Sequence, residues 1–495
     1  MLFTPRLTSF TKHPGREGSR VVLLASAALG AGVLSLLWSS IPQFDPSGWL
    51  LWSRPLVDSS VRFTTLAFPS WKPLPALVDV PLVLSGSLAP ALWLVIVRAA
   101  TVLLGVTVFR LGRRWGGVAG GVFAVGGLVF VPDLLQTAGS GLIEPVVAAL
   151  VIGAVERHVV GRTSQALVLL VLAALARPEA WALLALYAIW LARSEPRLRL
   201  RVTLACATVP ALWLGGDLIG SGDAFHGSTL ARMAGIAARE HNPVREFPTT
   251  LGFALRGVPW PWLAAAVLGV FLPWRANRRV AAVLAGVTLA WVAVTVLEAT
   301  RGYPAESRFL IPAGALLSVL AAVGLGSVTG RTSSSWRRVA TGGALAVALA
   351  AGILSHGAGL VRQVARVDAY GSAARQLDRA LAAAGGPRAL RGCRVTTQHP
   401  YQARLAWDLG RTTRAVSSPS PGGIVFERVR ARDPRLRRFL LSHAGLVSVT
   451  AFPLRHGRPW MLLRLSAAVP GRADPGPRCG IRALSARQDT PRRGA

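Results

Sequence analysis

The feature that most limits what this chain can fold into is its series of long apolar runs. Several reach the length of about 20 residues that a helix needs to cross a bilayer core. Hydrophobic residues make up 52% of the 495 residues and charged residues only 16%, whereas a soluble domain carries about 25% charged residues. The sequence therefore predicts a mainly α-helical, polytopic membrane bundle of about 11 spans.

Arginine marks the short loops between these runs. The formal net charge is +33, which in a soluble protein would suggest nucleic-acid binding. However, short cytoplasmic loops of membrane proteins are enriched in Arg and Lys, and no basic stripe has aromatic residues interleaved. We therefore expect a multi-pass protein of the cell membrane that contacts membrane lipids and no nucleic acid, with a cytoplasmic N-terminus and an extracytoplasmic C-terminal domain.

The same rule divides the chain into regions. Residues 1–20 are predicted to be a cytoplasmic tail. The apolar run at 21–38 is predicted to be a retained signal-anchor helix, because no small-residue cleavage site follows it. The transmembrane bundle is expected to extend over 21–360, with outer loops at 39–88 and 220–258.

The C-terminal part reads differently from the bundle. Residues 361–480 are predicted to form a small extracytoplasmic α/β domain, because an amphipathic helical stretch precedes strand-like segments at 393–397, 446–449 and 461–465. Residues 481–495 are polar and are predicted to be disordered.

The chain has 3 cysteines. Cys393 and Cys479 both fall in the outer domain, where disulfides persist, so we expect them to pair. The alternative is two unpaired small residues. Cys206 lies within an apolar run, where it is expected to serve in packing.

Carboxylates gather on one side of the predicted topology. Of the 22 Asp and Glu residues, only Glu17, Glu156 and Glu195 fall on the cytoplasmic side. A purely structural bundle has no need for this asymmetry, whereas an enzyme or a receptor acting at the outer face does. Since charge is costly in a membrane, ionisable residues near the outer helix ends are the functional candidates.

Asp45, in the first outer loop, is the candidate general base. Trp49 and Trp52 would shield it from water, so that its carboxylate could accept a proton from an attacking hydroxyl. The alternative is structural, because Asp before Pro46 is a typical N-cap pattern for a helix that begins at the proline. Asp58 is a second, weaker carboxylate candidate in this loop and is also typical of a turn.

Lys72 and Arg308 are the candidates for binding an anionic lipid head group. Lys72 follows Trp71 and precedes a short apolar segment at 74–84, which is predicted to be an interfacial helix. Arg308 opens a late span, where a guanidinium suits a phosphate. Each has a structural alternative, which is snorkelling for Lys72 and an ion pair with Glu306 for Arg308.

Other ionisable residues near outer helix ends complete the set. Arg98 lies in mid-span and is expected to face protein or water, with a carboxylate such as Asp79 or Asp133 as its partner. Glu144 and Glu179 begin helices, where the helix dipole also favours negative charge. The further substrate- or phosphate-binding candidates are Arg62, Arg177 and Glu179, and the remaining site candidates are Asp133, Glu144, Asp223 and His226.

No cofactor and no metal ligands are predicted. The sequence has no Cys/His cluster with metal-ligand spacing, no phosphate-binding glycine loop and no dinucleotide fingerprint. A divalent cation is compatible with the sequence but not indicated by it.

Three short segments carry a resemblance to a known family. They are Trp-Lys-Pro-Leu-Pro at 71–75, Arg-Pro-Glu-Ala-Trp at 177–181 and Gly-Tyr-Pro-x-x-x-Arg-Phe-Leu-Ile-Pro at 302–312. With an early Asp in a large first outer loop and a closing outer domain, this pattern resembles the type C glycosyltransferases of bacterial membranes, especially the actinobacterial mannosyl- and arabinosyltransferase-like members. The resemblance covers about residues 20–360.

The resemblance implies an activity. In that family the first outer loop carries a catalytic Asp, which would be Asp45, and basic residues hold the phosphate of a polyprenyl-phosphate sugar, which would be Lys72 and Arg308. An acceptor hydroxyl of an envelope glycan, lipid or protein would attack the anomeric carbon with inversion. The family often has two adjacent acidic residues in this loop, whereas here Pro46 follows Asp45.

Two alternatives to glycosyl transfer remain open at this point. One is a transporter or flippase for a lipid-linked sugar, which would predict discontinuous helices and polar groups near the midplane. The other is a non-catalytic envelope scaffold that resembles these enzymes and binds a partner or a cell-wall polymer.

Overall fold

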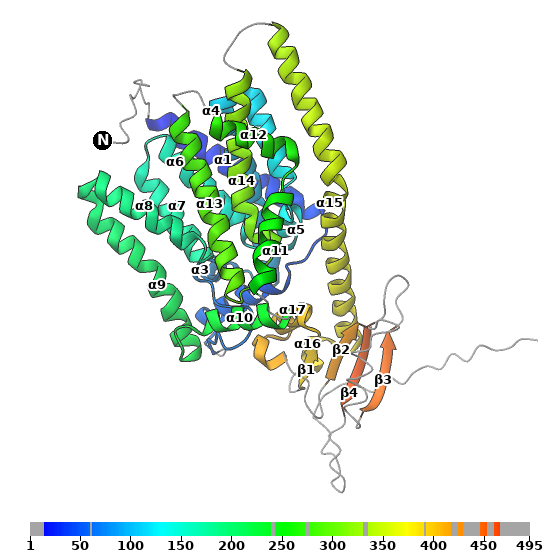
Figure 1. Cartoon of the computed structure of the whole chain (residues 1–495). Coiled ribbons are helices and arrows are strands. Elements are labelled where there is room, and N and C mark those ends of the chain that lie inside the picture. The colour runs from blue at the N-terminus through cyan, green and yellow to red at the C-terminus, as the bar shows by residue number, and fades with distance from the viewer. Residues whose placement is uncertain are drawn as a thin grey trace, which may run out of the picture.

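The chain forms a helical bundle with a small β-sheet at one end (Figure 1). The computed structural model describes residues 14–59, 62–238, 243–272, 277–329, 335–390, 393–416, 424–428, 446–452 and 460–465. The predicted disordered tail at 481–495 lies outside these residues, as does most of the predicted cytoplasmic tail.

The elements follow one another in the order of their labels. Ten of the helices are α1 (Pro14–Leu34), α4 (Ala89–Val129), α6 (Glu144–Val159), α7 (Thr163–Ala176), α8 (Ala180–Ser194), α9 (Arg199–Ser221), α12 (Trp260–Phe271), α13 (Arg278–Thr300), α14 (Ile311–Thr329) and α15 (Ser335–Ala383). The others are α2 (Phe44–Ser53), α3 (Pro73–Val83), α5 (Leu134–Ser140), α10 (His226–Ala238), α11 (Pro243–Arg256), α16 (Gly386–Ala389) and α17 (His399–Leu409). Short 3-10 turns are η1 (Ser35–Leu37), η2 (Arg54–Leu56), η3 (Gly86–Leu88), η4 (Pro196–Leu198), η5 (Ser307–Leu310) and η6 (Thr413–Val416).

α14 is the central helix of the bundle. A helix that is hydrophobic on all sides belongs in an interior, and Ile311, Leu316 and Val319 are fully buried among α4, α6, α12 and α13. Small residues let the backbones of apolar helices approach closely. At Gly324, an added Cβ would lie only 1.8 Å from the carbonyl oxygen of Ala265 in α12.

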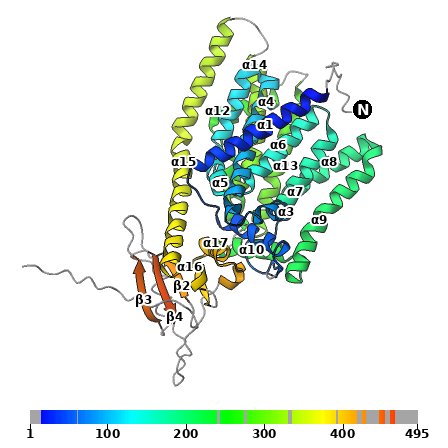
Figure 2. The ribbon, with the colours of Figure 1, turned by 180° about the vertical axis from the view of Figure 1, so that it is seen from behind.

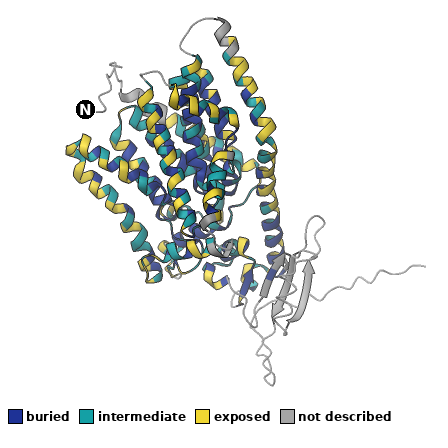
Figure 3. Cartoon of the chain, in the orientation of Figure 1, coloured by how far each residue is buried: buried dark blue, intermediate teal, exposed yellow. Residues whose placement is uncertain are grey.

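The helices are those of a multi-pass membrane protein. Among the described residues, 5 helices are long and apolar enough to cross a membrane, or up to 7 if each of two bent pairs counts as one span. Apolar side chains such as Leu204 on α9 and Leu354 on α15 are exposed. Exposed residues run along both helices at the margins of the bundle (Figure 3), where lipid would lie. The count of about 11 spans stays a prediction.

α4 consists of two helical arms that meet at a kink. Its backbone leaves the helical region at Gly117, where φ is 65° and ψ is −164°. An added Cβ at Gly121 would lie 2.8 Å from the ring of Phe109, although a straight helix would separate these residues by about 18 Å. The chain therefore reverses at Gly117 and packs its two arms against each other, as expected for spans joined by a short turn.

The first outer loop lies between α1 and α4. α1 crosses the bundle obliquely, and the chain then runs down to α2 and α3 near the sheet end (Figure 2). α3 (Pro73–Val83) confirms the short apolar helix predicted at 74–84. α2 and α3 pack on each other.

The C-terminal part combines helices with a four-stranded sheet. The strands are β1 (Val395–Thr397), β2 (Ile424–Arg428), β3 (Leu446–Phe452) and β4 (Trp460–Leu465), in the order β1-β2-β4-β3, with only the β1–β2 pair parallel. Three of the strands match the predicted ones, whereas β2 was not predicted. That this part is a separate extracytoplasmic domain stays a prediction.

The C-terminal part packs against the first outer loop. Phe44 and Leu51 of α2 share an apolar cluster with Leu377 near the end of α15 and with Tyr401 and Leu405 of α17. This cluster holds α2 between the bundle and α17.

We predict that Gly324→Ala destabilises the protein by about 1–3 kcal/mol, because the added methyl group overpacks the contact between α12 and α14. Gly286→Ala in α13 is the matched control, since nothing lies within 4 Å of a Cβ at that position. Unfolding of the two variants in detergent provides the measurement. Equal stabilities would contradict the close contact at Gly324.

Candidate active site

Segments far apart in the sequence meet around Arg308, which lies in η5 just before α14. Its Nη1 lies 3.9 Å from Oδ2 of Asp45 in α2. Its Nε lies 3.7 Å from Oε1 of Glu144 at the start of α6 and 2.5 Å from Oε2 of Glu306. One guanidinium therefore connects α2, α6 and the segment that precedes α14.

The predicted second outer loop approaches the same end of the bundle. The hydroxyl groups of Ser228 in α10 and Tyr303 are hydrogen-bonded at 2.6 Å. The N–H of Thr65 in the first outer loop donates to the carbonyl of Gly220 at 3.2 Å. Loops that the sequence placed on one face of the membrane are thus in mutual contact.

Asp45 lies in the first turn of α2. The N-cap residue is Gln43, and no side chain caps the helix. The capping interpretation of Asp45 is therefore wrong, because the helix already begins at Phe44. All other residues of α2 are buried, whereas the Asp45 side chain is 29% exposed, so its carboxylate is the one group of α2 that reaches out of the core.

Lys72 is a cation without a carboxylate partner in the part of the chain that the structure describes. Its half-buried side chain places Nζ 5.5 Å from the centre of the Trp49 ring. Burial lowers the pKa of Lys72 from its ordinary value, Asp45 and Glu144 act to raise it, and Arg177 and Arg308 lower it further. An anion beside Lys72 would offset the free-energy cost of burying its charge.

Arg177 is the centre of a buried ionic cluster that shares Glu144 with Arg308. Its Nη1 lies 2.8 Å from Oε1 of Glu144, and its Nη2 lies 2.5 Å from Oε1 of Glu179. The guanidinium carbon lies 3.9 Å from the centre of the Phe309 ring. Because these partners contact Arg177 on several sides, Arg177 and Glu179 serve to hold Glu144 in place. The predicted contact of Arg177 and Glu179 with substrate stays a prediction.

Three neighbours of this cluster were not singled out from the sequence as site candidates. Glu298, at the end of α13, interacts electrostatically with Arg177, and Glu306 pairs with Arg308. The two glutamates lie close together in the sequence before a late span, and this pattern could have indicated them as site candidates. His399 of α17 stacks on Phe44 with ring centres 4.4 Å apart, and nothing in the sequence indicated that α17 reaches the first outer loop.

The structure places the other candidates elsewhere. Asp133 accepts a hydrogen bond from Ser307 and lies 3.4 Å from Arg366 of α15. Asp223 is exposed and accepts from the N–H of Phe225. Three further candidates lie apart from Arg308. Asp58 follows η2, and Arg62 is exposed in the first outer loop. His226 begins α10.

Arg98 has a different environment from the predicted one. It donates from Nη1 to the carbonyl of Ser35 at 2.7 Å and from Nη2 to that of Gly139 at 3.3 Å, and it stacks on Trp38. The predicted pairing of Arg98 with Asp79 or Asp133 is wrong, because its Nη groups donate instead to Ser35 in η1, to the Ser40 hydroxyl and to the carbonyl of Gly139 in α5.

Two further sequence expectations concern metals and cysteines. Among the described residues, no group of three or more His, Cys, Asp or Glu side chains is placed to hold a metal ion. Cys393 takes part in a disulfide and Cys206 is free. The predicted partner of Cys393, Cys479, lies outside the described residues.

The fold has counterparts among solved structures. No protein-family model and no curated protein sequence matches this chain. Two crystal structures of ArnT from Cupriavidus metallidurans match it with a TM-score of 0.51 each, over 91% of this chain and 99% of ArnT. The identity is 15% for the structure bound to undecaprenyl phosphate and 13% for the apo state.

These likenesses establish the fold. They show that the chain shares the fold of ArnT. Membership of the type C glycosyltransferase superfamily stays a prediction. The actinobacterial mannosyl- and arabinosyltransferase-like subtype stays a prediction, and at this identity the activity does not follow from the fold.

We predict that Arg177→Met lowers the free energy of unfolding by about 3–5 kcal/mol, because it leaves Glu144 and Glu179 buried without their cation. Arg366→Met is the control, since that side chain is 56% exposed and exposed ion pairs contribute about 0–1 kcal/mol. Denaturation in detergent measures both. Similar losses for the two variants would show that the buried cluster does not support the site.

Proposed function

We propose that this chain is a type C membrane glycosyltransferase. It would move a sugar from a polyprenyl-phosphate donor to a hydroxyl of an acceptor at the outer face of the cell membrane. The observation that carries the proposal is Lys72, a cation without an ion-pair partner among the described residues, beside the Asp45–Arg308 pair. The binding of undecaprenyl phosphate by ArnT, which has the same fold, supports a lipid phosphate as the anion.

Asp45 is proposed to act as the general base. As an acceptor hydroxyl attacks the anomeric carbon, its proton passes to the Asp45 carboxylate. The new bond forms from the acceptor oxygen to the anomeric carbon, while the bond from this carbon to the phosphate oxygen breaks and leaves its electron pair on the phosphate. Direct attack opposite the leaving phosphate inverts the anomeric configuration. The products are the glycosylated acceptor and polyprenyl phosphate.

Lys72 and Arg308 are proposed to stabilise the leaving phosphate. Arg308 already faces Asp45, Glu144 and Glu306, so the uncompensated positive charge of the site comes mainly from Lys72. Donors that are held in place before the reaction stabilise developing charge most effectively where water is excluded.

The Asp45–Arg308 contact also suits the movement of charge during the reaction. The step transfers one negative charge from the Asp45 carboxylate to the lipid phosphate. Arg308 lies 3.9 Å from Asp45 before the reaction, and a phosphate at the same cluster would remain within its reach. The cation therefore faces a negative group at both ends of the step, and little reorganisation is required.

We predict that Asp45→Asn strongly slows transfer and leaves donor binding intact. Loss of a general base lowers the rate about 10²–10⁴-fold. Cells that lack the protein, and cells that carry Asp45→Asn, should lose the same sugar from their envelope glycans and accumulate a polyprenyl-phosphate sugar. Asp58→Asn, the same change in the same loop, should restore the glycan. Full restoration by Asp45→Asn would contradict its role as the base.

We also predict a pH dependence for the binding of undecaprenyl phosphate to the purified protein. The lysine must be protonated to attract the phosphate, so binding is strong below the lowered pKa of Lys72 and is lost as pH rises through it, before the ordinary value of 10.5 is reached. A phosphate monoester is already a dianion above a pH of about 6 and does not change in this range.

Two Lys72 variants separate charge from shape. Lys72→Arg should hold binding to higher pH, because arginine stays protonated to a pH of about 12. Lys72→Gln should weaken binding about 10- to 100-fold at neutral pH, as expected for the loss of a hydrogen bond to a charged group. Wild-type affinity in Lys72→Gln, or a binding curve of the wild type that stays flat to high pH, would contradict the assignment.

A further inference from the structure

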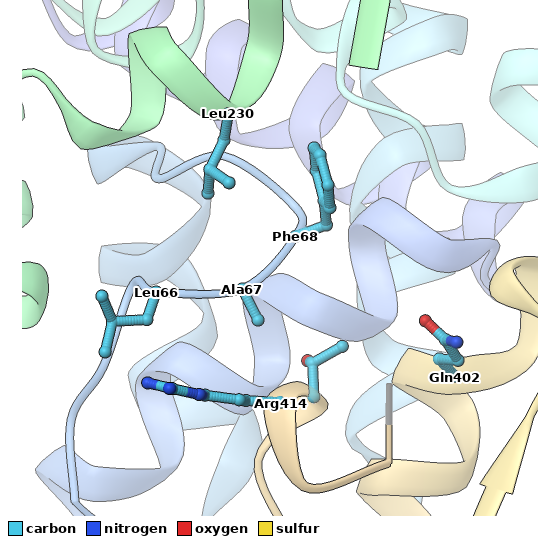
Figure 4. A pocket seen from close by; sticks show the side chains of 7 residues that line it. Leu66, Ala67, Phe68, Leu230, Gln402 and Arg414 are labelled. Carbon is cyan, nitrogen blue, oxygen red and sulfur yellow. The ribbon is translucent and has the colours of Figure 1, made fainter. Parts of the chain in front are cut away.

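A pocket of about 370 Å³ lies between the first outer loop, α10 and the C-terminal part of the chain. Leu66, Ala67 and Phe68 supply the loop wall, and Leu230 points toward them from α10 (Figure 4). Gln402 of α17 lies on the other side, and Thr413 and Arg414 of η6 complete the lining. A volume of this size falls within the range of about 300–1,000 Å³ that is typical of small-ligand sites.

Stacked rings connect this pocket to Asp45. Phe68, in the pocket wall, meets His399 edge-on with ring centres 6.3 Å apart. His399 stacks in turn on Phe44 at 4.4 Å, and Phe44 precedes Asp45 in α2. His399 and Asp45 also interact electrostatically. The pocket is therefore two ring contacts away from the residue beside the proposed base.

The two walls of the pocket differ in chemistry. Leu66, Ala67, Phe68 and Leu230 offer an apolar surface, whereas Gln402, Thr413 and Arg414 offer amide, hydroxyl and guanidinium groups. The Gln402 amide is held by a hydrogen bond of 3.0 Å from its Nε2 to the carbonyl of Thr397.

A sugar ring has matching chemistry, because its C–H faces are apolar and its rim carries hydroxyl groups. Arg414 is the charged residue of the lining, and a guanidinium recognises carboxylate and phosphate oxygens well.

We propose that this pocket holds the acceptor as a saccharide that carries an anionic group. The inference rests on the proposed function, since it assigns the second substrate of the same reaction. The donor phosphate would then meet Lys72, directly before α3, and Arg308 in η5, whereas the acceptor would be held beside Phe68. α17 and η6 close the acceptor pocket. The C-terminal part thus contributes to the reaction site as well as covering it.

Two sugars that differ in a single group test the proposal on the purified full-length protein. They are methyl β-D-glucopyranoside and the corresponding uronic acid, methyl β-D-glucopyranosiduronate, observed by saturation-transfer NMR in detergent. We expect transfer to the ring protons of both, with the acid binding about tenfold more tightly because it pairs with Arg414. Inorganic phosphate alone should not displace the neutral sugar. Displacement would mean that the pocket recognises charge without a saccharide and would overturn the proposal.

Two variants locate the binding. Arg414→Gln should remove the preference for the acid and keep the binding of the neutral sugar. Leu230→Trp should fill the pocket and abolish the signal from both sugars. Binding of undecaprenyl phosphate, measured on the same samples, should be unchanged in each variant, which shows that the protein is folded. No signal from the wild type, or unchanged signals in both variants, would overturn the proposal.

The same measurements separate this inference from the proposed function. If undecaprenyl phosphate binds and Asp45 is required for transfer, but neither sugar binds, the acceptor pocket is wrong and the glycosyltransferase assignment stands. If undecaprenyl phosphate does not bind to the wild type, the assignment of function fails first.

Discussion

The interaction on which the rest of this structure depends is the pairing of buried guanidinium and carboxylate groups at one end of an apolar bundle. A charge taken out of water without a partner is strongly destabilising, so Arg177 can be buried only where Glu144 and Glu179 meet it. Glu144 begins α6, whereas Arg177 and Glu179 lie in the turn between α7 and α8. The cluster therefore fixes how these helices meet, and it provides the rigid base on which Arg308 and Asp45 are set.

Much of the fold could be predicted because it follows from local rules. The apolar runs, the short helix α3 and the strands β1, β3 and β4 all carry patterns within single segments. The type of each element is encoded within its own segment. The gathering of acidic residues on one side of the membrane follows from the distribution of arginines and stays a prediction.

The partners of individual side chains could not be predicted in the same way. Arg98 was expected to need a carboxylate, but its Nη groups donate to the backbone carbonyls of Ser35 and Gly139, and every segment of the chain has carbonyls. Asp45 before proline had the pattern of a cap, yet the helix already begins at Phe44, which shares an apolar cluster with residues of α17. The contact of His399 with Phe44 depends on tertiary packing across the whole chain, which no local pattern records.

The helix α15 fixes the position of α17 and η6, which form one wall of the pocket. It is a continuous helix of 49 residues, which corresponds to about 74 Å in length, and it joins the far end of the bundle to the part that carries α17 and η6 (Figure 1). A flexible linker would let the two walls of the pocket separate and meet at an effective concentration set by its length. A helical rod, packed at its end against α2, makes their meeting a property of the folded state. The entropy of bringing the walls together is then lost once, during folding, and not each time a ligand binds.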